Sequence, residues 1–425
     1  MKIGMQTWGS HGDIRPFLAL AEGLQAAGHR VTLYITCFDN ESYAKVVSAN
    51  GVNIQLVASP VMDVAEGERI AQLVYETRDP MKQVATILET GFEPAEDEMF
   101  IAAQQLCQDN DLLIGHFFMH PLQIAAEKAQ KPYVSIVLAN VVVPTAYSNP
   151  LGINALGRWG HQLIWWLTQW GVHRAIQRFP NRLRRQIGLP PISNVMRDVW
   201  ISKALTLQAI SPQFCPSQPD WPASVKVCGF LDTPNLSIEG TLPDHLSDFL
   251  QQGPAPVYMT FGSWMPRDIS LQTATLELMT QAARQAGCRA IIQSPTPAQC
   301  GFVSDAQIFY ISAAPHHLIF PHCLAVVHHG GAGTTQATTL AGKPSIVVAH
   351  ISEQEYWARE MQQIGIAGPY TKRRQLTVRK LAQQIRYVVE RPDMATTAAD
   401  VAAAMKKENG VAEAVKLIDQ FIANN

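Results

Sequence analysis

A glycine-rich segment with hydrogen-bond donors, VVHHGGAGTT at residues 326–335, offers the clearest chemistry in this sequence. An apolar strand that leads into a glycine loop and then a helix lets phosphate oxygens approach backbone N–H groups closely, and the helix N-terminus attracts anions. Thr334 and Thr335 add hydroxyl donors, and His329 adds a ring N–H group. The segment is therefore predicted to bind an anion, with a diphosphate as the expected ligand. A glycine turn required only for packing would explain the glycines but not the histidines and threonines beside them.

Residues 9–13, GSHGD, form a second glycine-containing segment, which carries two side chains suited to proton transfer. His11 and Asp13 are both candidates for accepting a proton from a reacting hydroxyl group. His11 also has a simpler interpretation as a solvated loop residue, and Asp13 as the N-cap of a helix with Pro16 in its first turn. Such structural roles are compatible with catalysis, so both interpretations stay open.

The elements around residues 9–13 follow a strand, helix, strand order. We expect strands at residues 2–7, 31–36, 111–115 and 133–138, and helices at residues 16–27 and 122–130. This order predicts a parallel sheet with right-handed crossovers, in which ligands bind at the carboxyl ends of the strands. Residues 9–13 follow the first strand directly and are therefore expected at that edge.

The same alternation restarts in the second half of the chain. Strands are expected at residues 257–261, 290–293, 324–328 and 345–349, a helix at 271–286, and helices alone after residue 377. A length of 425 residues favours two domains, and six prolines between residues 212 and 243 favour an extended connection there. We therefore predict a first doubly wound domain at 1–215, a linker at 216–240, a second doubly wound domain at 241–400 and a C-terminal helix at 401–425.

The composition argues against several classes of function. The formal net charge of −2 gives no general attraction to nucleic acid, so no nucleic-acid partner is expected. The seven cysteines are scattered and never spaced as CxxC, which argues against a disulfide framework and a zinc site. No signal-peptide pattern and no run of about 18 or more uncharged apolar residues occurs. The cytoplasm is the expected location, and association with a membrane surface stays open.

Several motifs of the second half resemble a known family. They are Ala314-Pro315-His316, Phe320-Pro321, residues 328–335, Ala341-Gly342-Lys343-Pro344 and Glu353-Gln354-Glu355-Tyr356-Trp357. Together they resemble the donor-binding signature of the glycosyltransferases that use nucleotide sugars. This family contains sterol glucosyltransferases, macrolide and glycopeptide glycosyltransferases, and UDP-glucosyl- and glucuronosyltransferases. Residues 9–16, 257–263 and 409–411 resemble the start of each domain and the C-terminal helices of the same family.

The resemblance implies both a fold and a reaction. The fold is α/β, with two facing Rossmann-like doubly wound domains and an interdomain cleft, the arrangement called GT-B. The reaction is an inverting transfer of a hexose from a UDP- or dTDP-sugar to a hydroxyl of an apolar acceptor such as a sterol, terpenoid, polyketide or other lipid-like molecule. No metal and no cofactor beside the nucleotide sugar would be required, and no DxD-type acidic pair lies near residues 326–335.

The family's site residues transfer to matching positions of this sequence. Asp13 would be the catalytic base, with His11 as its competitor for that role. Glu353 and Gln354 would contact the sugar hydroxyls, and Ser10 would reach the diphosphate from the first domain. The other donor-binding residues are expected in two glycine-containing segments of the second domain: Gly262, Ser263, His329, Gly330, Gly331, Gly333, Thr334 and Thr335.

Three positions depart from the pattern of many relatives. Glu353 stands where many have Asp, so the preferred sugar does not transfer with the resemblance. Ala337 stands where some relatives hold the ribose with an acid, and Ala313 where plant members stack the base on tryptophan. The diphosphate is therefore expected to anchor the donor more than the base does.

Residues 158–185 hold four of the nine tryptophans together with six arginines. Tryptophan beside arginine suits the wall of an acceptor pocket or peripheral contact with an anionic membrane. A pair of packed helices with a basic outer face is the third interpretation, and the sequence does not choose among the three.

Two other functions fit parts of this pattern. A dinucleotide-binding oxidoreductase would also begin with a strand, a glycine loop and a helix, with Asp39 placed to bind ribose. However, Gly9 and Gly12 lack the GxGxxG spacing, and the second domain would have no role. A catalytically inactive carbohydrate- or nucleotide-binding protein on the same fold is the second alternative, and the presence of Asp13 argues against it.

Overall fold

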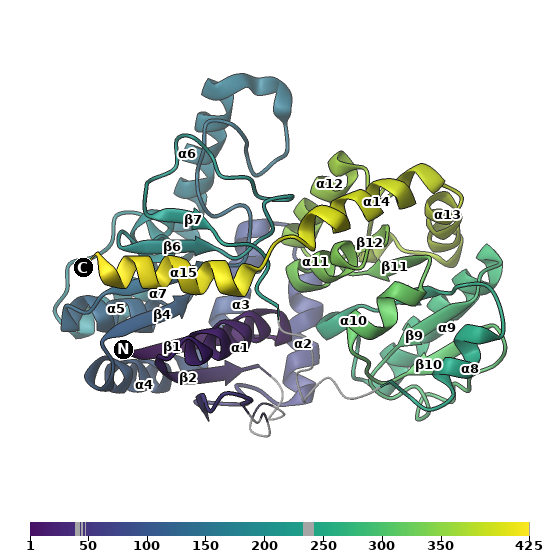
Figure 1. Cartoon of the computed structure of the whole chain (residues 1–425), viewed down its shortest axis with the longest axis horizontal. Coiled ribbons are helices and arrows are strands. Elements are labelled where there is room, and N and C mark those ends of the chain that lie inside the picture. Colours follow the sequence, from purple (N-terminus) through teal and green to yellow (C-terminus); the bar gives the residue numbers. More distant parts are fainter. Residues whose placement is uncertain (39–42, 44–45, 47, 233–241, 425) are drawn as a thin grey trace. The chain divides into compact units, whose positions relative to one another are not determined.

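The computed structural model describes residues 1–38, 43, 46, 48–232 and 242–424. The chain forms two compact units (Figure 1): unit 1 comprises Met1–Thr233 and Glu408–Asn425, and unit 2 comprises Pro234–Lys407. Unit 1 therefore includes the last helix of the chain. The predicted domain boundaries stay a prediction, because residues 233–240 of the predicted linker lie outside the described residues, as does Asp39. No helix in the described ranges is both long and apolar enough to cross a bilayer.

Unit 1 is built on a parallel sheet of seven strands in the order β3-β2-β1-β4-β5-β6-β7. The strands are β1 (Lys2–Gly9), β2 (Arg30–Cys37), β3 (Asn53–Leu56), β4 (Leu112–His116), β5 (Tyr133–Val137), β6 (Leu205–Gln208) and β7 (Val225–Val227). The direction of winding reverses between the neighbouring strands β1 and β4. In such sheets ligands bind at the carboxyl ends of the strands at this reversal.

The helices of unit 1 cover this sheet. They are α1 (His11–Ala26), α2 (Val64–Glu76), α3 (Pro80–Gly91), α4 (Glu96–Asp109), α5 (His120–Ala129), α6 (Gly157–Ile176), α7 (Arg178–Gln186) and α15 (Gly410–Ala423). α1 packs on β1 and β2 because Phe17, Leu20 and Leu24 follow helical spacing and are fully buried. α15 packs against α1, beside which it runs in Figure 1.

Unit 2 repeats the plan with a parallel sheet of six strands in the order β10-β9-β8-β11-β12-β13. The strands are β8 (Val257–Met259), β9 (Ala290–Gln293), β10 (Ile308–Ile311), β11 (Ala325–His328), β12 (Ser345–Ala349) and β13 (Thr371–Lys372). Its helices are α8 (Leu246–Gln251), α9 (Ile269–Ala286), α10 (His316–Ile319), α11 (Ala332–Leu340), α12 (Ser352–Ile364), α13 (Val378–Val389) and α14 (Pro392–Met405). The winding reverses between β8 and β11.

Alternation along the strands of unit 2 divides its core into two layers. Ala325 and Val327 of β11 face one hydrophobic cluster, whereas Val326 faces the other. All three side chains are fully buried, because a parallel strand with helices on both faces has no solvent side. This packing fixes where β11 ends, and therefore where the glycine loop at residues 329–331 begins.

The structure confirms two doubly wound parallel α/β sheets. It adds five strands of two to four residues that the sequence analysis did not predict, namely β3, β6, β7, β10 and β13. One expectation was wrong: residues 9–13 are not a loop before a helix that starts near Pro16, because α1 already begins at His11. Ser10 is the N-cap of α1 and Asp13 is its third residue, so Asp13 is not the N-cap.

Candidate active site

The fold brings Asp13 and His116 together at one edge of the unit 1 sheet. Asp13 lies in the first turn of α1, directly after β1, and His116 is the last residue of β4. Because β1 and β4 are neighbouring parallel strands, their carboxyl ends meet at the reversal of winding. His116 Nε2 lies 3.6 Å from Asp13 Oδ1.

The Asp13 carboxylate is held in place by the turn before it. Its Oδ2 atom accepts hydrogen bonds from the Ser10 backbone N–H at 2.9 Å and from the Ser10 hydroxyl at 3.0 Å. Gly9 allows this approach, since it has a φ of +133° and a Cβ there would lie 2.4 Å from Asp13 Oδ2. The side chain of Asp13 remains 35% exposed, so the carboxylate is accessible to a hydroxyl group.

His116 is buried and oriented toward that carboxylate. Its side chain is 2% exposed, and its Nδ1 accepts a hydrogen bond from the Phe118 backbone N–H at 3.3 Å. An accepting Nδ1 places the proton of a neutral ring on Nε2. Nε2 has no hydrogen-bond partner among the described residues, and Asp13 Oδ1 is the acid beside it. Separations of this kind shorten when substrate binds, so the pair is suited to proton transfer from a hydroxyl group.

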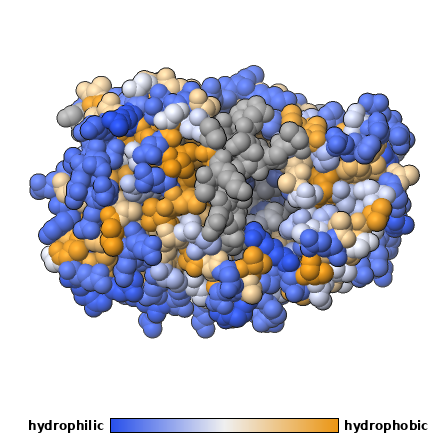
Figure 2. All heavy atoms as spheres, turned by 90° about the horizontal axis from the view of Figure 1, so that it is seen from below, coloured by the Kyte–Doolittle hydropathy of each residue, from blue (hydrophilic) through white to orange (hydrophobic). Residues whose placement is uncertain are grey.

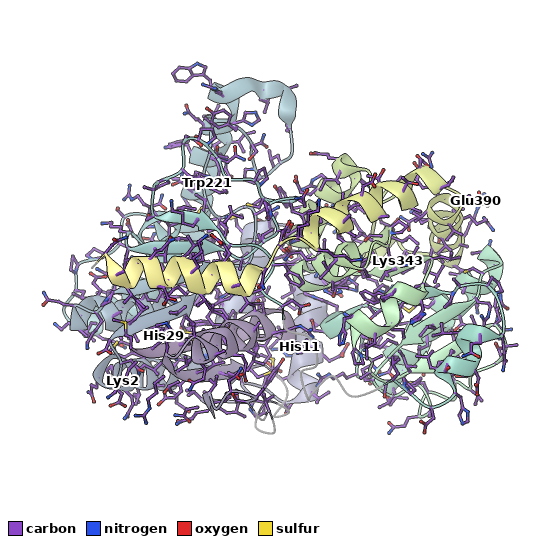
Figure 3. All side chains as sticks on the ribbon, in the orientation of Figure 1. Lys2, His11, His29, Trp221, Lys343 and Glu390 are labelled. Carbon is purple, nitrogen blue, oxygen red and sulfur yellow. The ribbon has the colours of Figure 1, made fainter. Side chains whose placement is uncertain are left out.

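His11 makes different contacts from Asp13. It is the first residue of α1 and is labelled in Figure 3. Its Nδ1 is hydrogen bonded to the Tyr43 hydroxyl, and the two rings stack with centroids 6.0 Å apart. Desolvation and the charge of Arg15, opposed by Asp232, lower the pKa of His11 to about 4. The ring is therefore neutral at pH 7 and remains so well below the pKa of an ordinary histidine.

In unit 2, the predicted donor residues converge at the carboxyl ends of β8 and β11. Gly262 and Ser263 follow β8, and residues 329–331 follow β11, its neighbour in the sheet. The ring of His329 fills the space between two glycines. A Cβ on Gly262 would lie 2.8 Å from its Cε1 atom, and a Cβ on Gly331 would lie 2.4 Å from its Nε2 atom. The two glycines are therefore required to seat the imidazole.

His329 is a buried, neutral ring beside a helix N-terminus. It is 8% exposed, and its Nδ1 has no hydrogen-bond partner among the described residues. Desolvation lowers its pKa to about 4. Gly331 is the N-cap of α11, which therefore begins beside the ring with unsatisfied N–H groups. A Cβ on Gly333 would meet nothing within 4 Å, so the first turn of α11 is open for the close approach of an anion.

The remaining residues of the glycine loop have varied surroundings. Gly330 has a φ of +90°, and a Cβ there would lie 2.9 Å from Val347, so it serves the backbone turn. Thr334 and Ser263 are accessible, whereas Thr335 is fully buried and its hydroxyl has no partner within the described ranges. The predicted diphosphate contacts of all four residues stay predictions.

Glu353 and Gln354 lie at the start of α12, and both take part in local hydrogen bonds. Glu353 Oε1 accepts a hydrogen bond of 2.5 Å from the Trp357 indole N–H. Gln354 Oε1 accepts one of 2.7 Å from the backbone N–H of His350, and Gln354 is 2% exposed. These contacts orient both side chains at the carboxyl edge of β12, and the assigned role in binding sugar stays a prediction.

His350 is a residue that the sequence analysis missed. It follows β12, and its ring lies edge-on to Phe261, 4.9 Å away between centroids. Desolvation lowers its pKa well below the usual value, and His329 and Arg373 add to this shift. Its signal in the sequence was a histidine directly after a predicted strand, at the same edge as the glycine loop.

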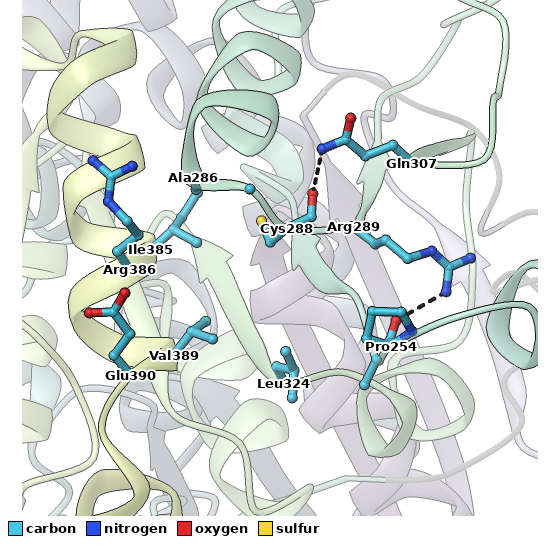
Figure 4. A pocket seen from close by; sticks show the side chains of 12 residues that line it. Pro254, Ala286, Cys288, Arg289, Gln307, Leu324, Ile385, Arg386, Val389 and Glu390 are labelled. Carbon is cyan, nitrogen blue, oxygen red and sulfur yellow. Dashed lines mark hydrogen bonds between the residues drawn. The ribbon is translucent and has the colours of Figure 1, made fainter.

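A pocket of about 230 Å³ lies in unit 2 but on the opposite edge of the sheet (Figure 4). Its lining residues Pro254, Arg289, Gln307 and Leu324 all precede strands. Arg289 and Gln307 are tied to backbone carbonyls at 3.0 and 3.1 Å. Because ligands of such sheets bind at the carboxyl ends, this pocket is not the donor site.

Within the described ranges no cluster of three or more metal-ligating side chains occurs. The predicted independence of metal stays a prediction.

Comparisons with known proteins match both halves of the chain. Residues 3–136 match the family described as Glycosyltransferase family 28 N-terminal domain, and residues 304–421 match Erythromycin biosynthesis protein CIII-like, C-terminal domain. An O-mycaminosyltylonolide 6-deoxyallosyltransferase of Streptomyces fradiae is 29% identical, covering 99% of this chain and 97% of its own. A sterol 3-beta-glucosyltransferase of Arabidopsis thaliana is 28% identical, covering 98% and 67%. One from Aspergillus fumigatus is 27% identical, but this chain spans only 30% of its length.

Solved structures show the same fold. The glycotransferase of kitacinnamycin matches with a TM-score of 0.70 at 17% identity, covering 99% of this chain and 98% of that one. The glycosyltransferase VinC in complex with DTDP matches with a TM-score of 0.66 at 18% identity, covering 100% of both chains. The two parallel sheets, each with one reversal of winding, therefore have the GT-B arrangement of glycosyltransferase structures.

Within that class the chain belongs to the family of sterol glucosyltransferases and macrolide glycosyltransferases. The prediction of this family and of a hexosyltransferase is confirmed. The oxidoreductase and the inactive binding protein are not supported by these relatives.

Proposed function

We propose that this enzyme transfers a hexose from a UDP- or dTDP-sugar to a hydroxyl of an apolar acceptor, with inversion at the anomeric carbon and without a metal ion. Relatives named for O-mycaminosyltylonolide and for sterols support an apolar acceptor. A structural neighbour that holds DTDP supports a nucleoside diphosphate as the donor's leaving group.

The observation that carries the proposal is the buried His329 ring at the N-terminus of α11. A neutral imidazole with an unpartnered Nδ1, next to open N–H groups, can hydrogen bond to a diphosphate without the cost of desolvating a cation. As the bond from the anomeric carbon to the diphosphate oxygen breaks, negative charge grows on that oxygen. Fixed N–H donors stabilise this charge where it develops.

Unit 1 provides the residue that accepts the proton of the acceptor hydroxyl. The acceptor oxygen forms the new bond to the anomeric carbon while its proton passes to Asp13, and the diphosphate leaves with the bonding electrons. Asp13 Oδ2 already accepts two hydrogen bonds from Ser10, so Oδ1 is the oxygen that takes the proton. His116 faces Oδ1 and stabilises the carboxylate in this position.

A donor and acceptor screen tests the proposal. The purified enzyme is incubated with UDP- and dTDP-hexoses and a panel of sterols, terpenoids, polyketides and phenolics, in buffer with EDTA. We expect a product in which the proton coupling at the anomeric carbon shows inversion relative to the donor. A product with retained configuration would contradict the mechanism, and activity that appears only on adding a divalent cation would contradict its metal independence.

A further inference from the structure

Helix α6 carries a stripe of large apolar side chains that remain exposed. Its members are Trp159, Leu163, Trp166, Leu167 and Trp170. Spacings of three and four residues place them on one side of the helix. The exposed fraction is 87% for Trp159 and 61% for Trp166. An exposed helix face of a globular protein is normally polar, so this stripe requires another explanation.

The opposite face of α6 already provides its packing. His161, Trp165, Val172 and Ile176 are buried, and α6 lies against α3. The Trp165 indole donates a hydrogen bond of 2.8 Å to the Ser148 carbonyl. The helix is therefore apolar on both sides, which is typical of helices that contact a second apolar environment.

The stripe is part of a larger apolar surface. Of the 21 large hydrophobic side chains that are exposed in the described residues, nine lie between positions 147 and 170. The four outside the helix, Tyr147, Leu151, Ile153 and Leu156, belong to the segment before it. This segment and α6 project from the sheet of unit 1 in Figure 1. Figure 2, which views the molecule from below, shows hydrophilic residues along most of the edge and hydrophobic patches nearer the middle.

The stretch of sequence that carries this surface has charged side chains of one sign only. The 70 residues from Lys128 to Arg197 contain nine Lys or Arg and no Asp or Glu, although the chain as a whole has 33 basic and 35 acidic residues. Arg158 and Arg174 are exposed at the two ends of the stripe and take part in none of the ion pairs between described residues. Their guanidinium groups lie 4.6 Å from the ring centroid of Tyr147 and 5.5 Å from that of Trp170.

Two other arginines of residues 158–185 are engaged in ion pairs away from this surface. Arg182 contacts Glu93 and Glu96, and the 5% exposed Arg184 contacts Glu127 at 2.6 and 2.9 Å. These ion pairs fasten α7 to α4 and α5. The basic character of α7 is thus largely structural; of its arginines, Arg185 is exposed and takes part in none of the ion pairs between described residues, as is the case for Arg158 and Arg174 beside the α6 stripe.

We propose that α6 and the segment before it dock on the surface of a membrane that contains anionic lipid. Tryptophan side chains would enter the boundary between headgroups and acyl chains, and Arg158 and Arg174 would contact lipid phosphates. Each cation held near an anionic surface adds about 1 kcal/mol of attraction, which neutral lipid does not provide. The inference uses none of the residues assigned to the reaction, so it stands or falls independently of the proposed function.

A second copy of this chain fits the surface less well. In a symmetric dimer the same face would meet itself, and the arginines of the two copies would approach each other without acids on α6 to separate them. A wall of the acceptor pocket does not account for cations at both ends of an exposed stripe.

Vesicle flotation of the full-length enzyme tests the proposal. The vesicles are pure phosphatidylcholine, or phosphatidylcholine with about 30 mol% phosphatidylglycerol, a fraction that gives a strongly negative surface. The test variant replaces Trp159, Trp166 and Trp170 with Gln. The matched control replaces Ile101 and Val303, which are 66% and 82% exposed elsewhere, with Gln. A third variant replaces Arg158 and Arg174 with Gln.

We expect the wild type and the Ile101/Val303 control to float with the anionic vesicles alike. The tryptophan variant should bind the anionic vesicles at least about tenfold more weakly than the wild type does. The arginine variant should bind neutral and anionic vesicles equally. Circular dichroism and turnover of a water-soluble acceptor confirm that the variants fold. Wild-type protein that fails to float, or a tryptophan variant that floats normally, would overturn the proposal. A wild-type dimer that the tryptophan substitutions dissociate, without flotation, would assign the surface to a second copy instead.

Discussion

His116 Nε2 faces Asp13 Oδ1 at 3.6 Å, and these two atoms come from the carboxyl ends of the neighbouring strands β4 and β1. The Phe118 N–H fixes the ring from its other side, at Nδ1. A carboxylate on α1 is therefore oriented by a buried imidazole, while Ser10 holds its second oxygen. His116 acts through Asp13 in this arrangement, and we regard it as a positioning residue.

Removing the His116 ring should lower turnover only as long as Asp13 is present. We expect His116→Ala to reduce kcat by about tenfold with little change in nucleotide diphosphate affinity, because the carboxylate loses its orientation but the donor loop is untouched. In an Asp13→Asn background the same substitution should cost almost nothing, since residues that act as a unit are not additive. Equal losses in both backgrounds would show that His116 acts independently of Asp13.

The sequence predicted the fold through its periodic patterns and its glycines. The strands β1, β2, β4, β5, β9, β11 and β12 are mainly apolar, and the loop at 329–331 follows one of them. β13 was missed because two residues give no periodicity, and β3 because it is short, partly exposed and contains two polar residues. The start of α1 was placed too late because Pro16 was taken as a first-turn signal, whereas Ser10 and Asp13 cap the helix earlier.

Contacts between distant parts of the chain could not be predicted in the same way. Asp13 and His116 are separated by about a hundred residues, and only the strand order brings them together. The seating of His329 between Gly262 and Gly331 likewise depends on β8 lying beside β11. The sequence indicated Asp13 and His329 singly, as candidates beside strand ends, but not the residues that contact them.

Gly331 and Gly333 should respond differently to the same added methyl group. A Cβ at Gly331 would lie 2.4 Å from His329 Nε2, so Gly331→Ala must displace the ring. We expect a loss of about tenfold or more in nucleotide diphosphate affinity, and a cost of about 1–3 kcal/mol in the free energy of unfolding from overpacking. Titration calorimetry and urea unfolding measure the two effects.

Gly333→Ala is the matched control, since a Cβ there meets nothing within 4 Å. Its free energy of unfolding should be no lower than that of the wild type, because alanine at a compatible helical position stabilises by up to about 1 kcal/mol. Weaker nucleotide binding in this stable variant would show that the diphosphate approaches the first turn of α11. If both variants bind nucleotide normally, the loop at residues 329–333 is not the donor site.

Uridine and thymidine diphosphates should compete for the donor site with affinities within about tenfold, or roughly 1.4 kcal/mol. Ala313 and Ala337 offer neither a stacking ring nor a ribose acid, so the shared diphosphate provides most of the binding. His329→Ala should weaken both nucleotides alike. A preference beyond about a thousandfold would reveal a base or ribose contact elsewhere in the chain.

Unit 2 should lose stability when the pH falls below the pKa of an ordinary histidine. Burial lowers the pKa of His328 to about 3 and of His329 to about 4, and that of His350 well below its usual value. In the unfolded chain these rings titrate near pH 6.5, so the unfolded state binds more protons between about pH 6.5 and 4. The stabilisation is complete above that window and is lost as the pH falls through it.

Each of the three rings contributes up to about 1.4 kcal/mol per pH unit to this loss. Urea unfolding at a series of pH values measures it, and His329→Gln should reduce the slope by one ring's share. A free energy of unfolding that does not change between pH 7 and 5 would contradict the burial of neutral histidines.

Asp13→Asn should separate catalysis from donor binding. Asparagine keeps the size of the side chain and can still accept the hydrogen bonds from Ser10, but it cannot take up a proton. A carboxylate is too weak a base to deprotonate an alcohol before attack. It accepts the proton while the new bond forms, which requires that it reach the hydroxyl. We therefore expect kcat to fall by about a hundredfold or more, while the Kd for nucleotide diphosphate changes little.

His11 provides the matching comparison. It lies two residues before Asp13 in the same helix turn, and its imidazole is the alternative to the carboxylate as the base. Its ring is neutral at pH 7 and already hydrogen bonded to Tyr43, so it is less free than the carboxylate to meet a substrate. His11→Ala should therefore lower kcat much less than Asp13→Asn does. Its effect on donor affinity should be larger than that of Asp13→Asn. Single-turnover kinetics and titration calorimetry on both variants distinguish the two roles. Near-normal turnover in Asp13→Asn, together with an inactive His11→Ala that still binds nucleotide, would make His11 the base and exchange the two assignments.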